Sequence, residues 1–185
     1  MTAKKLLIMF QEYESISKSH ALPFEVVQAQ ADRVGIPLMI RGAGWTDYEV
    51  KFIEGMNECR ADGITHGVFG DIDLVGHLEW VQKTCAKSEI IPIHPLWQEP
   101  RRSILEEMLK VGFEAVIVVI NTQMMPSDYI GRTFTLELMN ELEALGIDSC
   151  GENGEFHTIV INGPIFSSRL PVTFGDVREN ENYVF

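Results

Sequence analysis

One segment of the chain crowds groups that could do chemistry into a few positions. Residues 150–158 read Cys-Gly-Glu-Asn-Gly-Glu-Phe-His-Thr, with the carboxylates of Glu152 and Glu155 three positions apart around Asn153. A thiol precedes them, and the imidazole of His157 follows. Because an Asn-Gly step lets the backbone fold sharply, these side chains can be directed into one small volume. Carboxylates bind cations and an imidazole exchanges protons near neutral pH, so the segment predicts a binding or acid–base site.

Two other interpretations of this segment stay open. Glu-Asn-Gly-Glu is also typical of a solvated hairpin turn, in which both acids would only face water. Cys, Glu and His can all bind zinc, but no second Cys/His cluster occurs at ligand spacing, so we predict no metal site. The flanking Cys150 and Gly151 are unusual choices for a plain solvent loop, and this favours the functional interpretation.

The elements that must position these groups alternate along the chain. Apolar runs predict strands at residues 4–10, 36–40, 65–70, 90–94 and 115–120, and a further strand begins at Phe156. Segments with helical apolar spacing separate them. The second of these helices is expected to open with a capping box of Thr46 and Glu49. Glycines that can take positive φ mark the helix ends, at positions 35, 63, 112 and 146.

This alternation predicts an α/β fold. We expect a Rossmann-like parallel sheet with helices on both faces, and a small C-terminal lobe that contains β-structure. Residues 115–120 are mostly β-branched and show no alternation, as is typical of a strand covered on both faces. With 185 residues, the chain is expected to form an α/β domain over residues 1–122 and a C-terminal lobe over residues 123–185.

Polar residues collect where the predicted parallel strands end. Ligands bind outside the carboxyl ends of such strands, because loops and helix N-termini converge there. His94 could also be a loop histidine with ordinary partners, and Trp97 could belong to the core. Their common edge nevertheless favours a binding site, formed by Asp71, Asp73, His94, Trp97, Asn121 and Thr122.

The composition of the chain limits the classes of partner that it is expected to bind. Fifteen basic residues against 27 acidic ones give a net charge of −12, which disfavours nucleic acid and anionic membrane surfaces as partners. The apolar runs are too short for a signal peptide or a membrane span, so a cytoplasmic location is expected. The chain has three cysteines at unrelated spacings, which argues against a disulfide framework; Cys59 and Cys85 are placed like core residues on helices.

Four motifs together resemble one known family. They are Gly70-Asp71, Pro95-Leu96-Trp97, Gly131-Arg132 and residues 150–158. From about Lys5 to Phe166 the chain is similar to the diphthine-ammonia ligase family, also described as a domain of the N-type ATP pyrophosphatases. The resemblance implies an adenine-nucleotide α-hydrolase fold and ATP as cosubstrate, with Mg²⁺ as a companion of its phosphates. The implied reaction adenylates a carboxylate, which ammonia then attacks to form an amide on a modified histidine of a translation elongation factor.

The resemblance also implies roles for individual residues. Phe10 matches the region beside adenine, and Gly70 and Asp71 match the strand end near the nucleotide. Glu152 and Glu155 match acids that hold the acceptor or ammonia. His157 stands where the family has a later acid, and its imidazole would act as the base near neutral pH. The implied partners are ammonia and a carboxylate that is either a small molecule or protein-borne. The residues expected to bind this substrate are His94, Trp97, Asn121, Arg132 and Asn153.

The chain departs from the family pattern at two places. Asn153 and His157 stand where the family usually has Gly and Glu, which affects the expected acceptor. The second departure is that the 185 residues contain no Ser-Gly-Gly-Lys-Asp-Ser loop, which in the family follows the first strand and cradles pyrophosphate. That strand would lie in the middle of the sheet, so its loss would leave two strand edges unpaired and favour association of copies.

Three explanations of the missing loop are considered. The first is that the segment carrying the loop is missing from the sequence, the second that the protein has lost ATP chemistry, and the third that a partner supplies the loop. The chain enters a strand almost at once, which favours the first. In each case ATP binding by this chain is expected to be weak. The alternative to an incomplete ligase is a module that binds a small ligand without catalysis.

Overall fold

The chain forms two units. The computed structural model describes residues 2–11 and 22–185, and the contacts among residues separate Met1–Asp32 and Ile36–Glu99 (unit 1) from Arg33–Gly35 and Pro100–Phe185 (unit 2). The boundary expected from the sequence lies at residue 122 instead. The two positions differ because the strand at residues 114–121 pairs only within unit 2.

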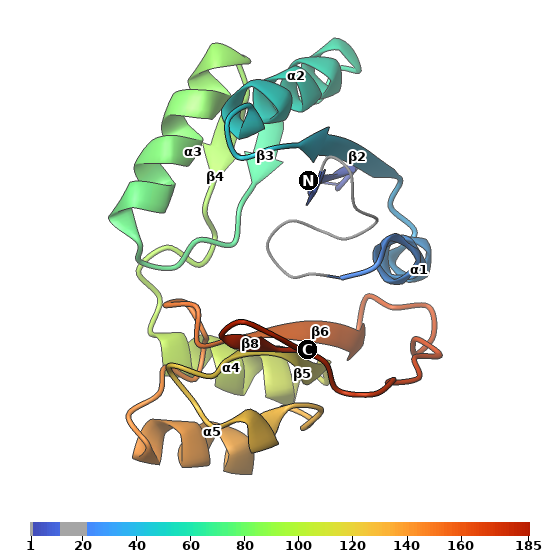
Figure 1. Cartoon of the computed structure of the whole chain (residues 1–185). Coiled ribbons are helices and arrows are strands. Elements are labelled where there is room, and N and C mark those ends of the chain that lie inside the picture. The colour runs from blue at the N-terminus through green and yellow to red at the C-terminus, as the bar shows by residue number, and fades with distance from the viewer. Residues whose placement is uncertain (1, 12–21) are drawn as a thin grey trace. The chain divides into compact units, whose positions relative to one another are not determined.

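Unit 1 is built from strand–helix repeats (Figure 1). Strands β1 and β2 pair in parallel, as do β3 and β4, and α1, α2 and α3 form the crossovers between successive strands. This confirms the predicted α/β class with parallel strands. The elements are β1 (Leu6–Gln11), α1 (Phe24–Val34), β2 (Leu38–Ala43), α2 (Tyr48–Ala61), β3 (His66–Val68), α3 (Val75–Lys87) and β4 (Ile91–Ile93).

The start of α2 differs from the prediction. A capping box of Thr46 and Glu49 was expected, but α2 begins at Tyr48 and its N-cap residue makes no side-chain cap hydrogen bond. The Glu49 carboxylate instead accepts hydrogen bonds from Lys83 (3.1 Å) and Lys87 (2.6 Å) on α3. Two lysines therefore draw Glu49 away from the helix terminus, and the capping-box prediction is wrong.

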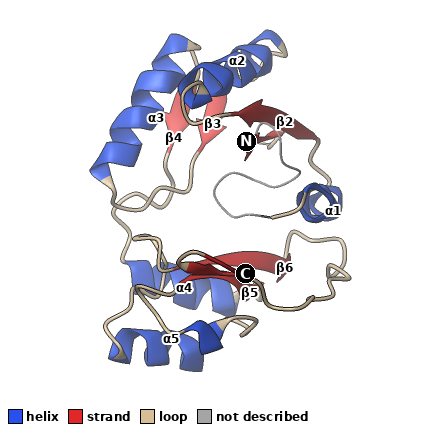
Figure 2. Ribbon diagram, viewed as in Figure 1, coloured by secondary structure: helices blue, strands red, loops and turns tan. Residues whose placement is uncertain are grey.

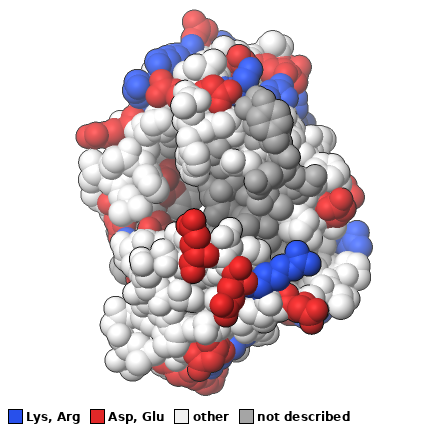
Figure 3. All heavy atoms as spheres, viewed as in Figure 1, with Lys and Arg blue, Asp and Glu red and all other residues white. Residues whose placement is uncertain are grey.

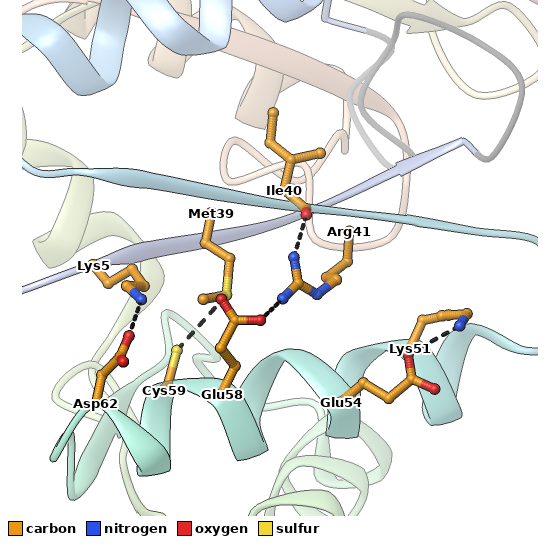
Figure 4. Close-up of polar contacts among 9 residues, drawn as sticks. All are labelled: Lys5, Met39, Ile40, Arg41, Lys51, Glu54, Glu58, Cys59 and Asp62. Atoms are coloured by element: carbon orange, nitrogen blue, oxygen red, sulfur yellow. Dashed lines mark hydrogen bonds and ion pairs between the residues drawn. The ribbon is translucent and has the colours of Figure 1, made fainter.

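Helix α2 is fixed to the β1–β2 pair at several points (Figure 4). Asp62, just after its last turn, forms an ion pair with Lys5, and Glu58 forms one with Arg41 of β2. Between them, the Cys59 thiol lies 4.0 Å from the Met39 sulfur. These contacts hold the helix along both strands.

The core of unit 1 joins β1, α2 and α3. Met9, Phe52, Met56, Val81 and Cys85 form one buried cluster, and Tyr48, Phe69 and Trp80 pack against it. The predicted core positions of Cys59 and Cys85 are confirmed, since both are buried free thiols.

Unit 1 is expected to lose stability at alkaline pH. Burial raises the pKa of the Cys85 thiol from 9.0 to about 11 and also raises the pKa of Cys59 and of Tyr48. The unfolded chain therefore releases these protons first, so stability is retained below about pH 9 and falls as pH rises toward 11. Urea unfolding followed by tryptophan fluorescence at about pH 8 and about pH 10.5 measures the loss.

The Cys85→Ala variant is the control for this prediction. It removes the group with the largest stated shift, so the difference between the two pH values should be smaller than in the unchanged chain. Equal midpoints at both pH values in the unchanged chain would contradict the prediction.

Unit 2 packs two helices on one face of an antiparallel sheet (Figure 2). The sheet order is β6-β5-β8-β7. Residues 115–120 were expected to form another parallel strand, but β5 pairs antiparallel with β6 and β8. The predicted small C-terminal lobe with β-structure is confirmed, and it includes β5. The elements are α4 (Arg101–Lys110), β5 (Glu114–Asn121), η1 (Ser127–Tyr129), α5 (Leu136–Ala144), β6 (Phe156–Asn162), β7 (Glu179–Asn180) and β8 (Tyr183–Val184).

The core of unit 2 explains why β5 lies in this unit. Ile117 and Ile120 of β5 are fully buried against Leu138 and Leu142 of α5, and Phe156 of β6 completes the cluster. Val116 and Val119 of the same strand are buried as well, so its unbroken apolar run matches burial on both faces.

The described surface carries interspersed charges. On the face drawn in Figure 3, acidic side chains lie next to basic ones without a broad basic patch among the described residues. No helix within residues 2–11 and 22–185 has both the length and the apolar character that a membrane span requires.

Candidate functional site

The segment at residues 148–155, here called the acidic loop, consists of two successive turns. The Gly151 N–H donates to the Asp148 carbonyl at 3.0 Å, and the Gly154 N–H donates to the Gly151 carbonyl at 3.1 Å. Gly151 has φ +69°, and a Cβ there would lie 2.9 Å from the Phe156 carbonyl oxygen. The predicted sharp fold of this segment is therefore present, and it requires glycine at 151.

Asp148 organises the first turn. Its Oδ1 accepts the Cys150 N–H and its Oδ2 accepts the Glu152 N–H, both at 3.0 Å. The same carboxylate forms an ion pair with Arg101 at the start of α4, and only 12% of the Asp148 side chain is exposed. Asp148 and Arg101 were not predicted. The available signal was an Asp two residues before Cys150, which is the spacing of an Asx-turn.

Glu155 organises the second turn. It is 5% exposed, and its Oε2 and Oε1 accept the Asn153 backbone N–H and side-chain Nδ2 at 3.1 Å each. Its carbonyl accepts the Asn121 N–H at 2.9 Å. The structure thus brings together Asn121, Asn153 and Glu155. The carboxylate of Glu155 fixes the turn, whereas Glu152 and His157 are only half-buried.

A small apolar cavity lies next to the acidic loop. It has a volume of about 60 Å³ and is lined by residues that include Cys150, Phe156, Thr158 and Leu105. The Cys150 thiol donates to the Arg101 carbonyl at 3.6 Å. A space of this volume holds at most a few waters, so it is too small for a nucleotide.

Arg132 binds Glu141, a residue outside the acidic loop. Its guanidinium donates to both carboxylate oxygens of Glu141 on α5, at 2.7 and 3.0 Å, and lies 4.7 Å from the ring centre of Tyr129. The ion pair lowers the pKa of Glu141 and raises that of Arg132. The role of Arg132 in substrate binding stays a prediction. In this geometry its guanidinium is bound to Glu141 of α5, which is a structural contact.

A second group of polar residues lies in unit 1, where β3 and β4 end. We call Asp71, His77 and His94 the histidine cluster. Asp71 Oδ2 lies 3.3 Å from His94 Nε2, and Asp71 Oδ1 lies 3.6 Å from His77 Nδ1. The His94 side chain is 8% exposed, and its Nε2 is buried without a well-oriented hydrogen bond.

Aromatic rings hold His94 in place. Phe69 stacks on the imidazole at 5.6 Å, and Trp97 meets it edge-on at 6.3 Å. Asp71, His94 and Trp97 thus lie together as expected, and His77 is a further member that was not predicted. The position of His77 six residues after Asp71, on the following helix, was the available signal. The expectation that Asn121 shares this edge is wrong, because Asn121 ends β5 in the antiparallel sheet of unit 2.

The remaining predicted residues have simpler surroundings. Phe10 is 5% exposed and packs edge-to-face on Phe24 at 6.3 Å, while Gly70 is exposed after β3. Neither placement tests a role toward adenine. Within the part of the chain that the structure describes, no group of three or more His, Cys, Asp or Glu side chains is arranged to hold a metal ion.

Both units match models of one protein family. A model described as the diphthamide synthase N-terminal domain matches residues 1–91, and one described as the diphthamide synthase C-terminal domain matches residues 100–184. The gap between the two matches includes the boundary of the two units at Glu99 and Pro100. The family division therefore follows the structural one.

Several curated proteins are similar to part of the chain, each with the name diphthine–ammonia ligase. The one from Danio rerio is 28% identical over 118 residues, which are 61% of this chain and 45% of that protein. The Rattus norvegicus protein is 29% identical over 99 residues (50% and 36%), and the Homo sapiens protein is 27% identical over 104 residues (52% and 38%). The matched stretch spans less than half the length of each of these relatives.

Proposed function

The chain belongs to the diphthamide synthase family, and from this membership we propose that it carries the acceptor and ammonia side of an ATP-dependent amide-forming ligase. In the proposed reaction a substrate carboxylate attacks the α-phosphate of ATP and releases pyrophosphate. Ammonia then attacks the acyl carbon, the amide forms and AMP leaves. The observation that carries the proposal is the acidic loop, which lies inside the stretch matched by the C-terminal-domain model. The acceptor of the relatives, diphthine, is the first candidate substrate.

We assign different roles to the two glutamates of the acidic loop. Because Glu155 accepts two hydrogen bonds from Asn153, we assign it to holding the loop in shape. Glu152 and His157 are then the groups that bind ammonium and remove its proton before attack. An imidazole takes up a proton near neutral pH more readily than a carboxylate, so His157 can act as the base where the family usually has Glu.

The histidine cluster is proposed to contact the nucleotide or the adenylated carboxylate. Ligands of parallel α/β sheets bind at the carboxyl ends of strands, where Asp71 and His94 lie. The chain's sequence offers no Ser-Gly-Gly-Lys-Asp-Ser loop to hold phosphates, and its charge of −12 repels a polyanion. ATP with Mg²⁺ remains the proposed cosubstrate, and a cytoplasmic setting stays a prediction.

The 185-residue chain is therefore expected to bind ATP no more tightly than adenosine. A phosphate-binding loop would add several charge-assisted hydrogen bonds to the triphosphate, and this sequence lacks it. Titration calorimetry with ATP, AMP and adenosine, with and without Mg²⁺, measures the difference. Micromolar binding of ATP together with much weaker binding of adenosine would show that phosphate binding resides in these residues, contrary to the prediction.

The reaction itself is tested by product formation. The chain is incubated with ATP, isotopically labelled ammonia and an acceptor protein bearing diphthine, and mass spectrometry detects replacement of the hydroxyl by an amino group. The assay is repeated with a diphthine–ammonia ligase of the family as positive control. Labelled amide above the level without the chain supports the ligase.

A second candidate function is a non-catalytic module that binds a small ligand. The specific observation in its favour is that both carboxylate oxygens of Glu155 accept hydrogen bonds from Asn153. Ammonium binding without any labelled product, also after the phosphate loop is supplied by fusion of a family N-terminal segment, would favour this candidate over the ligase.

A further inference from the structure

The proposed amide formation releases two protons. Ammonium and the adenylated carboxylate give the neutral amide, AMP and both of these protons. One proton leaves ammonium before the attack, and the other leaves the same nitrogen after the new C–N bond has formed. The role proposed for His157 accounts for the first proton only, so the reaction calls for a second proton acceptor.

Asp71 contacts two imidazoles in the histidine cluster of unit 1. Its Oδ2 lies 3.3 Å from Nε2 of His94, and its Oδ1 lies 3.6 Å from Nδ1 of His77. The two histidines differ in exposure, because the His94 side chain is 8% exposed and the His77 side chain is 65% exposed. The carboxylate thus has one buried imidazole and one solvent-exposed imidazole as neighbours.

The buried part of the cluster fixes the position of Asp71. Phe69 stacks on the His94 ring at 5.6 Å. The Gln98 N–H donates at 2.7 Å to the carbonyl of Ile72, the residue after Asp71, and this bond joins the segments that follow β3 and β4. The Asp71 side chain is itself only 17% exposed. Its carboxylate is therefore held in place before any substrate binds.

His77 lies in the first turn of α3. The helix begins at Val75, and the His77 N–H donates to the Leu74 carbonyl at 3.0 Å, so a regular helix places the side chain. An imidazole whose Nδ1–H faces a carboxylate can accept a proton on Nε2, and the carboxylate stabilises the imidazolium that forms. The 3.6 Å between His77 and Asp71 is longer than a hydrogen bond, and contacts of this kind commonly shorten when a substrate binds.

On the basis of the ligase function proposed above, we propose that Asp71 and His77 form a proton-transfer pair, in which Nε2 of His77 takes the second proton from the substrate nitrogen. The electron pair of the broken N–H bond stays on nitrogen, and AMP leaves with the electron pair of the C–O bond. His77 then returns its proton to water. Asp71 orients the imidazole, and His94 is a positioning residue that holds Asp71.

The pair itself is tested by the tautomer of His77 in the 185-residue chain. Long-range ¹H–¹⁵N correlation spectra at about pH 8, where an ordinary imidazole is neutral, show which ring nitrogen carries the proton. His77 is expected to be protonated on Nδ1, and Asp71→Asn should remove this preference. His66, whose Nδ1 lies 2.8 Å from the Thr65 hydroxyl, is the internal control and should not respond to Asp71→Asn. An Nε2–H tautomer of His77, or no response to Asp71→Asn, would overturn the pair.

The proton transfer is tested in the labelled-ammonia assay, with the chain alone and with the fused family N-terminal segment. His77→Ala should lower kcat about 100-fold and leave the KM for ammonia nearly unchanged. Added imidazole should restore part of the rate, because the site of this side chain is open to solvent. Asp71→Asn should lower kcat about tenfold or more without rescue by imidazole, since His77 still fills its place.

The outcomes separate this inference from the ligase function. An unchanged rate of labelled amide formation with His77→Ala would contradict the role of His77 but not the ligase. A raised KM without rescue by imidazole would show that His77 binds substrate and transfers no proton. If neither form of the chain makes labelled amide, the ligase function and the second-proton role are both wrong, and the tautomer of His77 still decides whether Asp71 and His77 form a pair.

Discussion

The Asp148→Ala variant is expected to be less stable to unfolding of unit 2 by about 3 kcal/mol. The substitution leaves the N–H groups of Cys150 and Glu152 without their acceptor. It also removes the Asp148 carboxylate from its ion pair with Arg101, whose side chain is only 25% exposed. A partly buried charge that loses its partner costs more than a surface ion pair contributes, so the effect should exceed that of removing an exposed pair such as Lys51–Glu54.

Urea unfolding followed by far-ultraviolet circular dichroism measures the loss, together with hydrogen exchange of the α5 amides. The three tryptophans of the chain, Trp45, Trp80 and Trp97, all lie in unit 1, so their fluorescence reports that unit separately. Asp148→Asn is the matched control: it keeps one acceptor oxygen and should cost clearly less. If alanine and asparagine at 148 left the exchange of α5 unchanged, the turn would not depend on this carboxylate.

Much of unit 1 could be predicted from local pattern. Helical spacing and strand runs are short-range signals, and glycines with positive φ follow the helices in both units, at residues 35, 63, 112 and 146. The capping box at Thr46 was wrong because Glu49 is bonded to two lysines of α3, which are 34 and 38 residues away. Local spacing carries no information about such distant partners.

The pairing of β5 could not be predicted from local sequence either. Its run of β-branched residues has the composition of a covered strand, and the sequence alone gives no direction for its partners. Its partners are β6 and β8, at residues 156–162 and 183–184. The antiparallel pairing therefore depends on contacts that are distant in sequence, and these also place the unit boundary near residue 100.

The acidic loop could be located from the sequence, but the different roles of its two glutamates could not be predicted. Residue types and glycine positions indicated a sharp turn with clustered polar groups, which is present. Which acid is buried depends on hydrogen bonds to Asn153 and Asn121, and Asp148, outside the motif, forms the other half of the turn. Two glutamates that look equivalent in the sequence thus have different surroundings in the fold.

This difference predicts opposite behaviour of two isosteric variants. Glu155→Gln places an amide N–H₂ against one of the two donors of Asn153, because only one of its terminal atoms can accept a hydrogen bond. Since the site is 5% exposed, water cannot replace the lost acceptor, and the expected cost is about 2 kcal/mol, with about tenfold faster exchange of the Asn153 amide. Glu152→Gln should change neither quantity by a comparable amount, because the turn uses the backbone N–H of Glu152.

Unfolding in urea and amide exchange at Asn153 distinguish the two glutamates in the same preparation. Glu152→Gln serves as the matched control for loss of one negative charge in the loop, so a shift common to both variants would reflect charge alone. A larger effect at 152 than at 155 would reverse the assignment, making Glu152 the residue that shapes the loop. A buried carboxylate bonded to two donors cannot also hold a substrate without breaking those bonds, so the expected result assigns Glu155 to the shape of the loop.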